Sequence, residues 1–241
     1  KYPSERKTEI AVDYGDIEDA DLIPVEQVVI SLTHSGYIKR MPISEYKAQH
    51  RGGMGITAHR PKEEDFVESM FICSSHDDIL MFSSLGRVYS IKGYQIPEAA
   101  RTARGRAIVN LVQVAQDEKI NALIAVRQPE EGESRGYIAF ATKNGLMKKT
   151  SVTEFDRVNK NGKIAIKLND GDELISVHHT SGSDEIMIAT RGGKCIRFPE
   201  EDVRAMGRDT AGVRAIRLDG EDDRLVDMLV IDPQKDIFTV A

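Results

Sequence analysis

Short apolar runs, each broken by a glycine turn, recur along the chain and predict β-strands. The apolar pattern is continuous or alternating over four to seven positions, as at Val28–Ile30 and Ile186–Ile188, and glycine or asparagine bounds it. Strands of this length with these boundaries are the units of β-sandwiches and propeller-like blades. Four such units begin at Val28, Ile79, Tyr137 and Ile186.

Each unit also carries two glycines at nearly constant positions. The turn glycines Gly36, Gly86, Gly145 and Gly193 are 50, 59 and 48 residues apart, and the second glycines Gly53, Gly105, Gly162 and Gly212 follow 17 to 19 residues later. Each turn glycine stands where a two-residue hairpin needs a positive φ. A period near 50 with a β pattern indicates stacked units, because one unit cannot bury its apolar face alone. We therefore predict an all-β, propeller-like ring of four-stranded blades.

The repeats divide the chain into one domain, residues 1–241, with a leading segment and four blades. Residues 1–27 should dock on the first blade, and the repeats run over about 28–78, 79–136, 137–185 and 186–236. Residues 237–241 begin a further blade, since they resemble an opening strand without its hairpin, so we expect the natural domain to continue beyond them. Short helical turns are expected within 43–49, 154–158 and 199–206, where Pro, Ser, Thr or Asp supply starts.

Composition narrows the class of protein. Aromatic residues make up 6% and tryptophan is missing, which predicts an aliphatic core. No run of 18 apolar residues occurs, and the first ten residues lack the apolar region of a signal peptide. Cys73 and Cys195 are predicted to be small buried residues in a reducing cytoplasm, not a disulfide or a metal pair.

Charge is segregated along the chain although the net charge is −6. The windows 36–60, 86–108, 143–168 and 191–217, which contain the turn glycines and the loops after them, carry net charges of +4, +4, +5 and +3. Together they hold +16, which leaves −22 for the other 140 residues, where acidic residues gather in the segments between blades. Any one charged run is usually a solvated face. Four basic windows in register, however, predict a basic belt of the kind that attracts nucleic-acid backbone.

One short motif stands out in the first repeat. It consists of Gln49, His50, Arg51, Gly52, Gly53, Met54 and Gly55. Its glycines permit close backbone approach and expose amide N–H groups, and Arg51 supplies a cationic donor for phosphate oxygens. A Gly-rich basic loop is weak evidence alone, but its place at the basic edge of the repeat favours phosphate binding.

The motif and the repeats together resemble the C-terminal domain of the A subunit of DNA gyrase, over essentially the whole chain. The resemblance rests on the opening residues 1–10, on the stretch from Asp21 to Gly55 and on the repeat period. The family pattern QRRGGKG matches at Gln49, Arg51, Gly52, Gly53 and Gly55. His50 and Met54 depart from it, which removes up to two positive charges and reduces the expected wrapping strength at this site. The implied fold is a β-pinwheel, a ring of usually six blades with exchanged strands, of which the last would be incomplete in this chain.

The resemblance also implies a function. The domain would be a non-catalytic module that wraps double-stranded DNA chirally and presents it to the cleavage core of an ATP-dependent type II topoisomerase, so that negative supercoils are introduced. Its partners would be the rest of the gyrase A subunit and the gyrase B subunit, in the cytoplasm at the nucleoid. We expect no membrane association, a monomeric isolated domain, no cofactor in this domain, and ATP and Mg bound elsewhere in the parent enzyme.

Binding of this kind would work through Lys and Arg contacts to phosphates, with counterion release and little base reading. Besides the motif Gln49–Gly55, the candidate contacts are Lys39, Arg40, Arg87, Arg101, Arg104, Arg106, Lys148, Lys149, Lys160, Lys163, Arg191, Lys194, Arg197, Arg208 and Arg214.

Three alternatives stay open. The related domain of the topoisomerase IV A subunit serves decatenation and lacks an intact motif, so five matching positions favour gyrase. A protein-binding β-propeller of WD or kelch type is disfavoured because tryptophan is missing and the loop edges are basic. An enzyme on the same scaffold would need a catalytic motif, and no P-loop, GxSxG or HExxH pattern occurs. His178 and His179 have no cysteine or carboxylate partner at a metal-ligand spacing.

Overall fold

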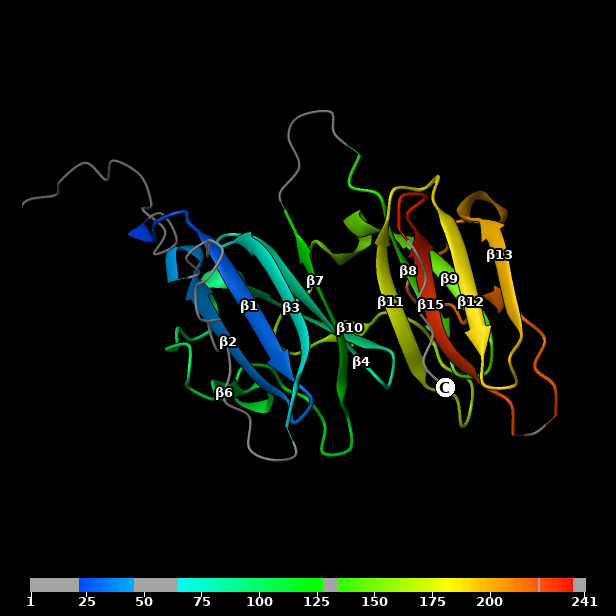
Figure 1. Cartoon of the computed structure of the whole chain (residues 1–241), viewed down its shortest axis with the longest axis horizontal. Helices are drawn as coiled ribbons and strands as arrows, with labels where there is room; N and C mark the ends of the chain where they lie inside the picture. The colour runs from blue at the N-terminus through cyan, green and yellow to red at the C-terminus, as the bar shows by residue number, and fades with distance from the viewer. Residues whose placement is uncertain (1–21, 46–64, 128–133, 221, 236–241) are drawn as a thin grey trace, which may run out of the picture.

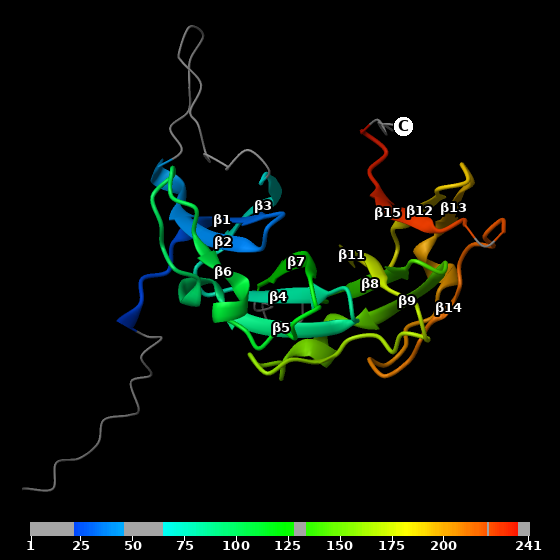
Figure 2. The ribbon, with the colours of Figure 1, turned by 90° about the horizontal axis from the view of Figure 1, so that it is seen from below.

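The computed structural model describes residues 22–45, 65–127, 134–220 and 222–235. In this part of the chain the strands form four antiparallel sheets (Figure 1). Figure 2 shows the sheets following one another along an arc, with the first and the last at opposite ends. The prediction of all-β blades is confirmed, because each sheet is one blade built around a glycine hairpin.

Each blade has its own spatial order of strands. The first contains β3 (Val67–Ser74), β1 (Gln27–Thr33), β2 (Tyr37–Pro42) and β6 (Arg106–Ala107). The second contains β10 (Lys163–Ile164), β5 (Arg87–Lys92), β4 (Asp78–Ser83) and β7 (Ile120–Val126). The third contains β11 (Leu174–Thr180), β8 (Tyr137–Thr142), β9 (Leu146–Ser151) and β14 (Val213–Arg214). The fourth contains β13 (Cys195–Pro199), β12 (Glu185–Thr190) and β15 (Leu225–Ile231).

Strand exchange links neighbouring blades. The outermost strand of the first blade, β6, comes from the second repeat, and it pairs with β2 through Tyr37 and Ile38. In the same way β10 of the third repeat pairs with β5, and β14 of the fourth repeat pairs with β9. Each of these three blades is therefore completed by the repeat that follows it.

The hairpins at the turn glycines differ from the prediction in length. Gly36 has φ 78° and donates its N–H to the Thr33 carbonyl at 2.8 Å, and the loop between Thr33 and Tyr37 holds three residues. The prediction of two-residue loops was therefore wrong, because a turn followed by a positive-φ glycine closes a three-residue loop instead. The positive φ itself is confirmed at all four glycines, with values of 78°, 72°, 80° and 84°.

A side-chain hydroxyl before each turn glycine stabilises the turn. Thr33 Oγ1 accepts the N–H of Tyr37, the residue after the glycine, at 3.2 Å. Ser83, Thr142 and Thr190 make the equivalent bond in the other repeats. The hydroxyl residue three positions before the glycine is thus part of the turn signature, and it is visible in the sequence.

The core lies between blades, in three clusters. Val28, Ile30 and Leu32 of the first blade pack with Ile79 and Met81 of the second. Between the third and fourth blades, Ala139, Ala141 and Met147 pack with Ile186 and Ile188.

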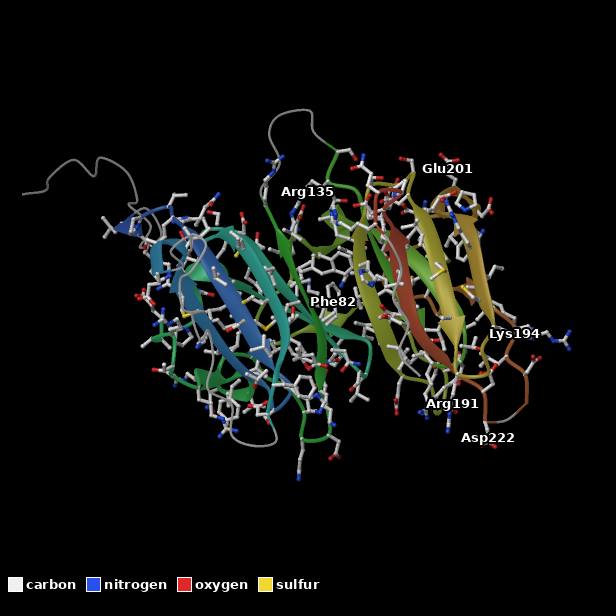
Figure 3. The ribbon with its side chains drawn as sticks, in the orientation of Figure 1. Phe82, Arg135, Arg191, Lys194, Glu201 and Asp222 are labelled. Atoms are coloured by element: carbon white, nitrogen blue, oxygen red, sulfur yellow. The ribbon has the colours of Figure 1, made fainter. Side chains whose placement is uncertain are left out.

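The buried core is mainly aliphatic, as predicted, but the middle cluster also contains three phenylalanines. The rings of Phe82 and Phe140 meet edge to face at 5.4 Å, and Phe155 lies 5.9 Å from Phe82. Figure 3 shows Phe82 between the second and third blades. Low aromatic content did not prevent clustering, because three of the phenylalanines gather at one joint.

Short 3-10 turns follow the second strand of each repeat. They are η2 (Ile43–Glu45), η3 (Gly93–Gln95), η5 (Val152–Phe155) and η6 (Glu200–Asp202), with η4 (Ile108–Asn110) after an exchanged strand. The three predicted helical turns are confirmed, and η3 and η4 were not expected. No helix of the described residues is both long and apolar enough to cross a membrane.

The two cysteines lie in different environments. Both are free, Cys73 buried on β3 and Cys195 exposed on β13. The prediction that both are buried is wrong for Cys195, because β13 is the edge of its sheet within the described chain.

Candidate nucleic-acid interface

Exchanged strands carry predicted cations to the outer edges of the first three blades. Arg106 of β6 lies beside Ile38, and Lys163 of β10 occupies the equivalent place beside Val88. Arg214 of β14 stands one position further along its strand, beside Leu146, so its side chain leaves the opposite face. Arg106 and Arg214 are exposed and Lys163 is half-buried. The same structural element thus presents positive charge on successive blades.

The fourth blade presents its cations on the β12–β13 hairpin. Arg191 lies in the turn, and Lys194 and Arg197 follow it, all three exposed. In Figure 3 the Lys194 side chain extends away from the ribbon. Lys194 pairs with Asp219 at 2.6 Å, and Arg197 pairs with Glu185 across the hairpin.

Seven of the predicted contacts keep their charge free of ion pairs with other described residues. They are Arg87, Arg101, Arg106, Lys160, Lys163, Arg191 and Arg214. Arg87 nevertheless donates to the Tyr89 hydroxyl and to the Asn161 carbonyl, both at 3.2 Å, which holds its guanidinium over the exchanged loop.

Three further candidates are ion-paired arginines. Arg40 lies 3.2 Å from Glu98, Arg208 lies 3.9 Å from Glu154, and Arg104 lies 3.9 Å from Asp65. Arg104 also stacks over the Tyr37 ring at 3.6 Å. Exposed pairs contribute about 0–1 kcal/mol each, so a phosphate could replace the exposed carboxylates of Glu98 and Glu154 at small cost. The Asp65 carboxylate is buried, so this reasoning does not extend to its pair with Arg104.

Three predicted contacts are not at the surface at all. Lys39, Lys148 and Lys149 have relative exposures of 1%, 0% and 6%. Their assignment as phosphate contacts is therefore corrected. A lysine at the end of an amphipathic strand looks like a surface cation in the sequence, but in the fold each of these ammonium groups meets acceptor oxygens of the next repeat. Carbonyl oxygens surround Lys39 and Lys148, and Glu200 accepts from Lys149.

Lys39 and Lys148 occupy closely similar cages. Lys39 Nζ donates to the carbonyls of Arg101 at 2.6 Å and Ala103 at 3.0 Å, with Ala100 at 3.4 Å. Burial lowers the pKa of Lys39, which the nearby charge of Glu45 partly opposes.

Lys148 Nζ likewise meets three carbonyls, those of Arg208 at 2.6 Å, Gly207 at 3.0 Å and Thr210 at 3.3 Å. Burial lowers its pKa to about 8, while Asp209 acts in the opposite direction.

Lys149 forms a buried ion pair instead. Its Nζ donates to the Glu200 carbonyl at 3.0 Å and lies 3.6 Å from the Glu200 carboxylate. Glu200 in turn accepts from Thr180 Oγ1 at 2.6 Å and from the Gly182 N–H at 3.0 Å. Every oxygen of this fully buried carboxylate is thereby engaged, which compensates for its removal from water.

Carboxylates from the acidic links cap the glycine turns. Asp65 accepts the Ser35 N–H at 2.9 Å, Asp172 accepts that of Asn144 at 2.9 Å, and Asp223 accepts that of Gly192 at 2.7 Å. Charge that is segregated along the chain is therefore brought together at these turns in the fold, because unpaired turn amides attract carboxylates from the returning chain. Figure 3 shows Arg191 and Asp222 at the same end of the fourth blade.

The hydrogen bonds to Asp223 lower its pKa, the one from the Asp219 N–H most strongly. The sequence reasoning also missed cations that gather at this end of the blades. Lys143, Arg191 and Arg224 line a groove of about 460 Å³ between the third and fourth blades, together with Glu173. Arg224 lies inside an acidic link, which gave no signal of its position.

The motif Gln49–Gly55 lies outside the described residues. Within the described residues, no group of three or more His, Cys, Asp or Glu side chains could hold a metal ion. His178 contacts Ser176 Oγ at 3.2 Å, and His179 contacts the Arg135 carbonyl at 2.8 Å.

Comparison with known proteins places this architecture in a family. A family model described as the DNA gyrase C-terminal domain, beta-propeller, matches residues 27–74, 77–127, 136–181 and 184–232. The DNA gyrase A subunit of Escherichia coli K12 is 53% identical over 230 residues, which covers 95% of this chain and 26% of that protein. The Salmonella typhimurium LT2 protein of the same name is 49% identical over 241 residues, covering 100% and 27%.

Solved structures of related domains have the same fold. The C-terminal domain of DNA topoisomerase IV has a TM-score of 0.73 at 26% identity, and covers 88% of this chain and 63% of that one. The DNA gyrase A C-terminal domain has a TM-score of 0.61 at 26% identity, covering 85% and 65%. The chain spans about a quarter of the length of the curated relatives it matches. It belongs to the DNA gyrase C-terminal domain family, as its repeats and motif predicted.

Proposed function

We propose that the chain binds double-stranded DNA along the outer edge of its arc of blades and wraps it chirally, without base specificity. The observation that carries the proposal is the recurrence of solvent-accessible cations on exchanged outer strands and on the last hairpin. They are the exposed Arg106, Lys194 and Arg214 and the half-buried Lys163. Positive charge that recurs from blade to blade along a curved edge suits a long polyanion.

Bending the duplex is the energetic obstacle. Smoothly bending 20–30 bp costs about 1–6 kcal/mol, so contacts must continue over several blades to offset it. The arc of Figure 2 supplies such a path, whereas a single blade would not. Contacts of this kind go to phosphates and release counterions, so binding should weaken steeply with salt.

The names of the relatives support a proposal for the parent activity. Those with 45–53% identity are named as the A subunit of DNA gyrase and come from bacteria. The domain would therefore serve an ATP-dependent type II topoisomerase as its wrapping module in the cytoplasm, together with the rest of the A subunit and the gyrase B subunit. It would have no catalytic residue or cofactor of its own. The TM-score of 0.73 keeps the topoisomerase IV domain as the second candidate.

A topology measurement tests the proposal. The chain is incubated with nicked circular DNA, the nick is ligated, protein is removed, and the linking number is compared at two salt concentrations. A shift of positive sign that fades with salt supports chiral wrapping. DNA retention without any shift would move the assignment towards the topoisomerase IV domain. No retention at low salt would remove DNA as the partner and favour a protein-binding propeller.

The motif Gln49–Gly55 is tested in the complete enzyme. Alanine replacement of its seven residues should abolish supercoiling while relaxation continues. Unchanged supercoiling would show that the cations of the blades suffice and that this loop does not dominate wrapping.

A further inference from the structure

The two lysine cages are related by the repeat. Lys39 and Lys148 each stand three residues after their turn glycine, Gly36 or Gly145. Each ammonium group meets carbonyls that lie five, four and two residues before the second glycine of the next repeat, Gly105 or Gly212. An ammonium group has three donors, so three carbonyls saturate it. A geometry that recurs between different blades is a built connection and not a local accident.

Each cage joins one blade to a loop that bears cations of the next repeat. The shortest bond in both cages goes to the carbonyl of an arginine, Arg101 or Arg208, at 2.6 Å. Both arginines are among the candidate DNA contacts, and the exchanged strand begins just beyond the same loop. The buried lysine therefore fixes the backbone from which those side chains reach the surface.

The second glycines show how closely the loop approaches the blade. A Cβ added at Gly105 would lie 2.6 Å from the Ile38 carbonyl oxygen, and one at Gly212 would collide with the Met147 carbonyl. At both joints the backbone of the loop is therefore in close contact with the backbone of the preceding blade, and the hydrogen bonds of the buried lysine lie beside this contact.

The middle joint is built differently. Tyr89 holds the position of the lysine, its ring fills the space beside Gly162, and its hydroxyl donates to Glu118 at 2.8 Å. The loop of the third repeat is also shorter, because its second glycine follows the turn glycine by 17 residues where the second and fourth repeats have 19. A groove of about 600 Å³, lined by Ser90 and Lys160 among others, lies beside this loop.

At the first and third joints, backbone contacts occupy the position that corresponds to this groove. Arg40 pairs in parallel with Glu98, and Lys149 pairs in parallel with Ala205. Ser90, the corresponding residue of the second blade, has no such bridge among the described residues. The lysine cages thus occur at the two joints where the loop of the next repeat forms a parallel backbone bridge with the second strand of the hairpin.

We propose that Lys39 and Lys148 are positioning residues for DNA wrapping, each locking the cation-bearing loop of the next repeat to its own blade. This inference rests on the proposed wrapping function. The lysines touch no DNA; they hold the angle between adjacent blades, and with it the path of the outer cations, constant against the recoil of the bent duplex.

The experiment separates binding from wrapping. Lys148→Met keeps the length and apolar stem but leaves three carbonyls without their donor. Affinity for a short linear duplex should stay within about threefold, because no phosphate contact is lost. The linking-number change per bound domain, measured at equal occupancy and well below the unfolding temperature, should fall clearly. Lys39→Met should act in the same way at the first joint.

Two control variants isolate the mechanism. Lys160→Met removes an exposed candidate contact, so it should weaken binding and lower the salt slope by about 0.9 without changing the wrap per bound domain. Ile138→Val trims the core between the second and third blades, and should lower stability while leaving both DNA readouts unchanged.

A readout without DNA completes the test. Hydrogen exchange in Lys148→Met should accelerate at the Met206 and Ala215 amides, which bond to the Lys149 and Gly145 carbonyls, and should be unchanged at the Ile96 amide of the second repeat. Wild-type wrapping by Lys148→Met, or an equal loss of wrapping in Ile138→Val, would overturn the positioning role of the lysines and leave the proposed function standing. A wild-type chain that shifts no linking number would overturn the proposed function, and the positioning role would fall with it.

Discussion

Tyr89 donates its hydroxyl to the Glu118 carboxylate at 2.8 Å in the interior of the second blade. Both side chains are buried, and the same Glu118 oxygen accepts the Ala115 N–H at 3.0 Å. The tyrosine thereby connects β5 to the segment of the same repeat that leads into β7. Burial raises the pKa of Tyr89, and the bond to Glu118 raises it further.

Removing this hydroxyl should destabilise the domain. Tyr89→Phe leaves the Glu118 oxygen with the Ala115 N–H as its remaining donor, so the free energy of unfolding should fall by about 1–3 kcal/mol. Urea denaturation measures it. Tyr94→Phe, at a half-buried ring beside His76, should change stability by less than about 0.5 kcal/mol. Equal effects of the two variants would contradict the role assigned to the bond.

The buried pair of Lys149 and Glu200 makes a second prediction. Lys149→Met removes the cation and leaves a carboxylate with 0% exposure, which should lower the free energy of unfolding by about 3–5 kcal/mol. Adding Glu200→Gln to Lys149→Met should restore part of the loss, since the neutral amide removes the unpaired buried charge. The amide oxygen can keep the bond from the Gly182 N–H, while the amide NH2 can donate to Thr180 Oγ1. A double-mutant cycle of denaturant unfolding gives the coupling; a value near zero would mean that the pair is not coupled.

Glycine positions separate backbone strain from steric collision. Gly105→Ala places a Cβ 2.6 Å from the Ile38 carbonyl at φ 91°, so it should lose more than the ~1–2 kcal/mol of left-handed strain alone. Gly193→Ala, at φ 84° with nothing within 4 Å, should show strain only. Gly207→Ala has open space and no positive φ, and should be nearly neutral. Thermal unfolding of the three variants should follow that order; any other order would refute the close approach.

The lowered pKa of Lys148 predicts that the stability of the domain rises with pH. Its pKa is about 8 in the folded state against 10.5 for an ordinary lysine, so between these values the unfolded chain binds more protons. The free energy of unfolding contributed by this residue should therefore rise with pH across that window, by roughly 3 kcal/mol if the full difference applies. The difference in stability between wild type and Lys148→Met, measured by urea unfolding on either side of the window, reports it. A pH-independent difference would mean that the cage keeps the ammonium charged.

The repeat, the hairpins and the all-β blades could be predicted from the sequence because glycine spacing and apolar alternation are local signals. Which lysine is buried could not. Lys39 and Lys160 look alike as residues in basic windows, and only the fold of the following repeat decides that one meets carbonyls and the other solvent. Strand exchange is hidden for the same reason, since β6, β10 and β14 are two residues long.

The candidate site was predicted in part. Arg106, Arg191 and Arg214 lie exposed, as cations expected to reach phosphates should. Carboxylates such as Asp65 and Asp223 were assigned to separate acidic links, but their nearest partners are turn amides far away in sequence. Such partners follow from hydrogen-bond satisfaction in the folded chain, which charge counting does not include.

Strand exchange also means that repeat and blade are out of phase. During synthesis on the ribosome, the first blade cannot acquire its outer strand until residues 106–107 have emerged, and the third waits for residues 213–214. Until then the second strand of each hairpin offers an open edge to any neighbouring nascent chain. The domain must therefore mature one repeat behind translation, with each newly made repeat closing the edge of its predecessor.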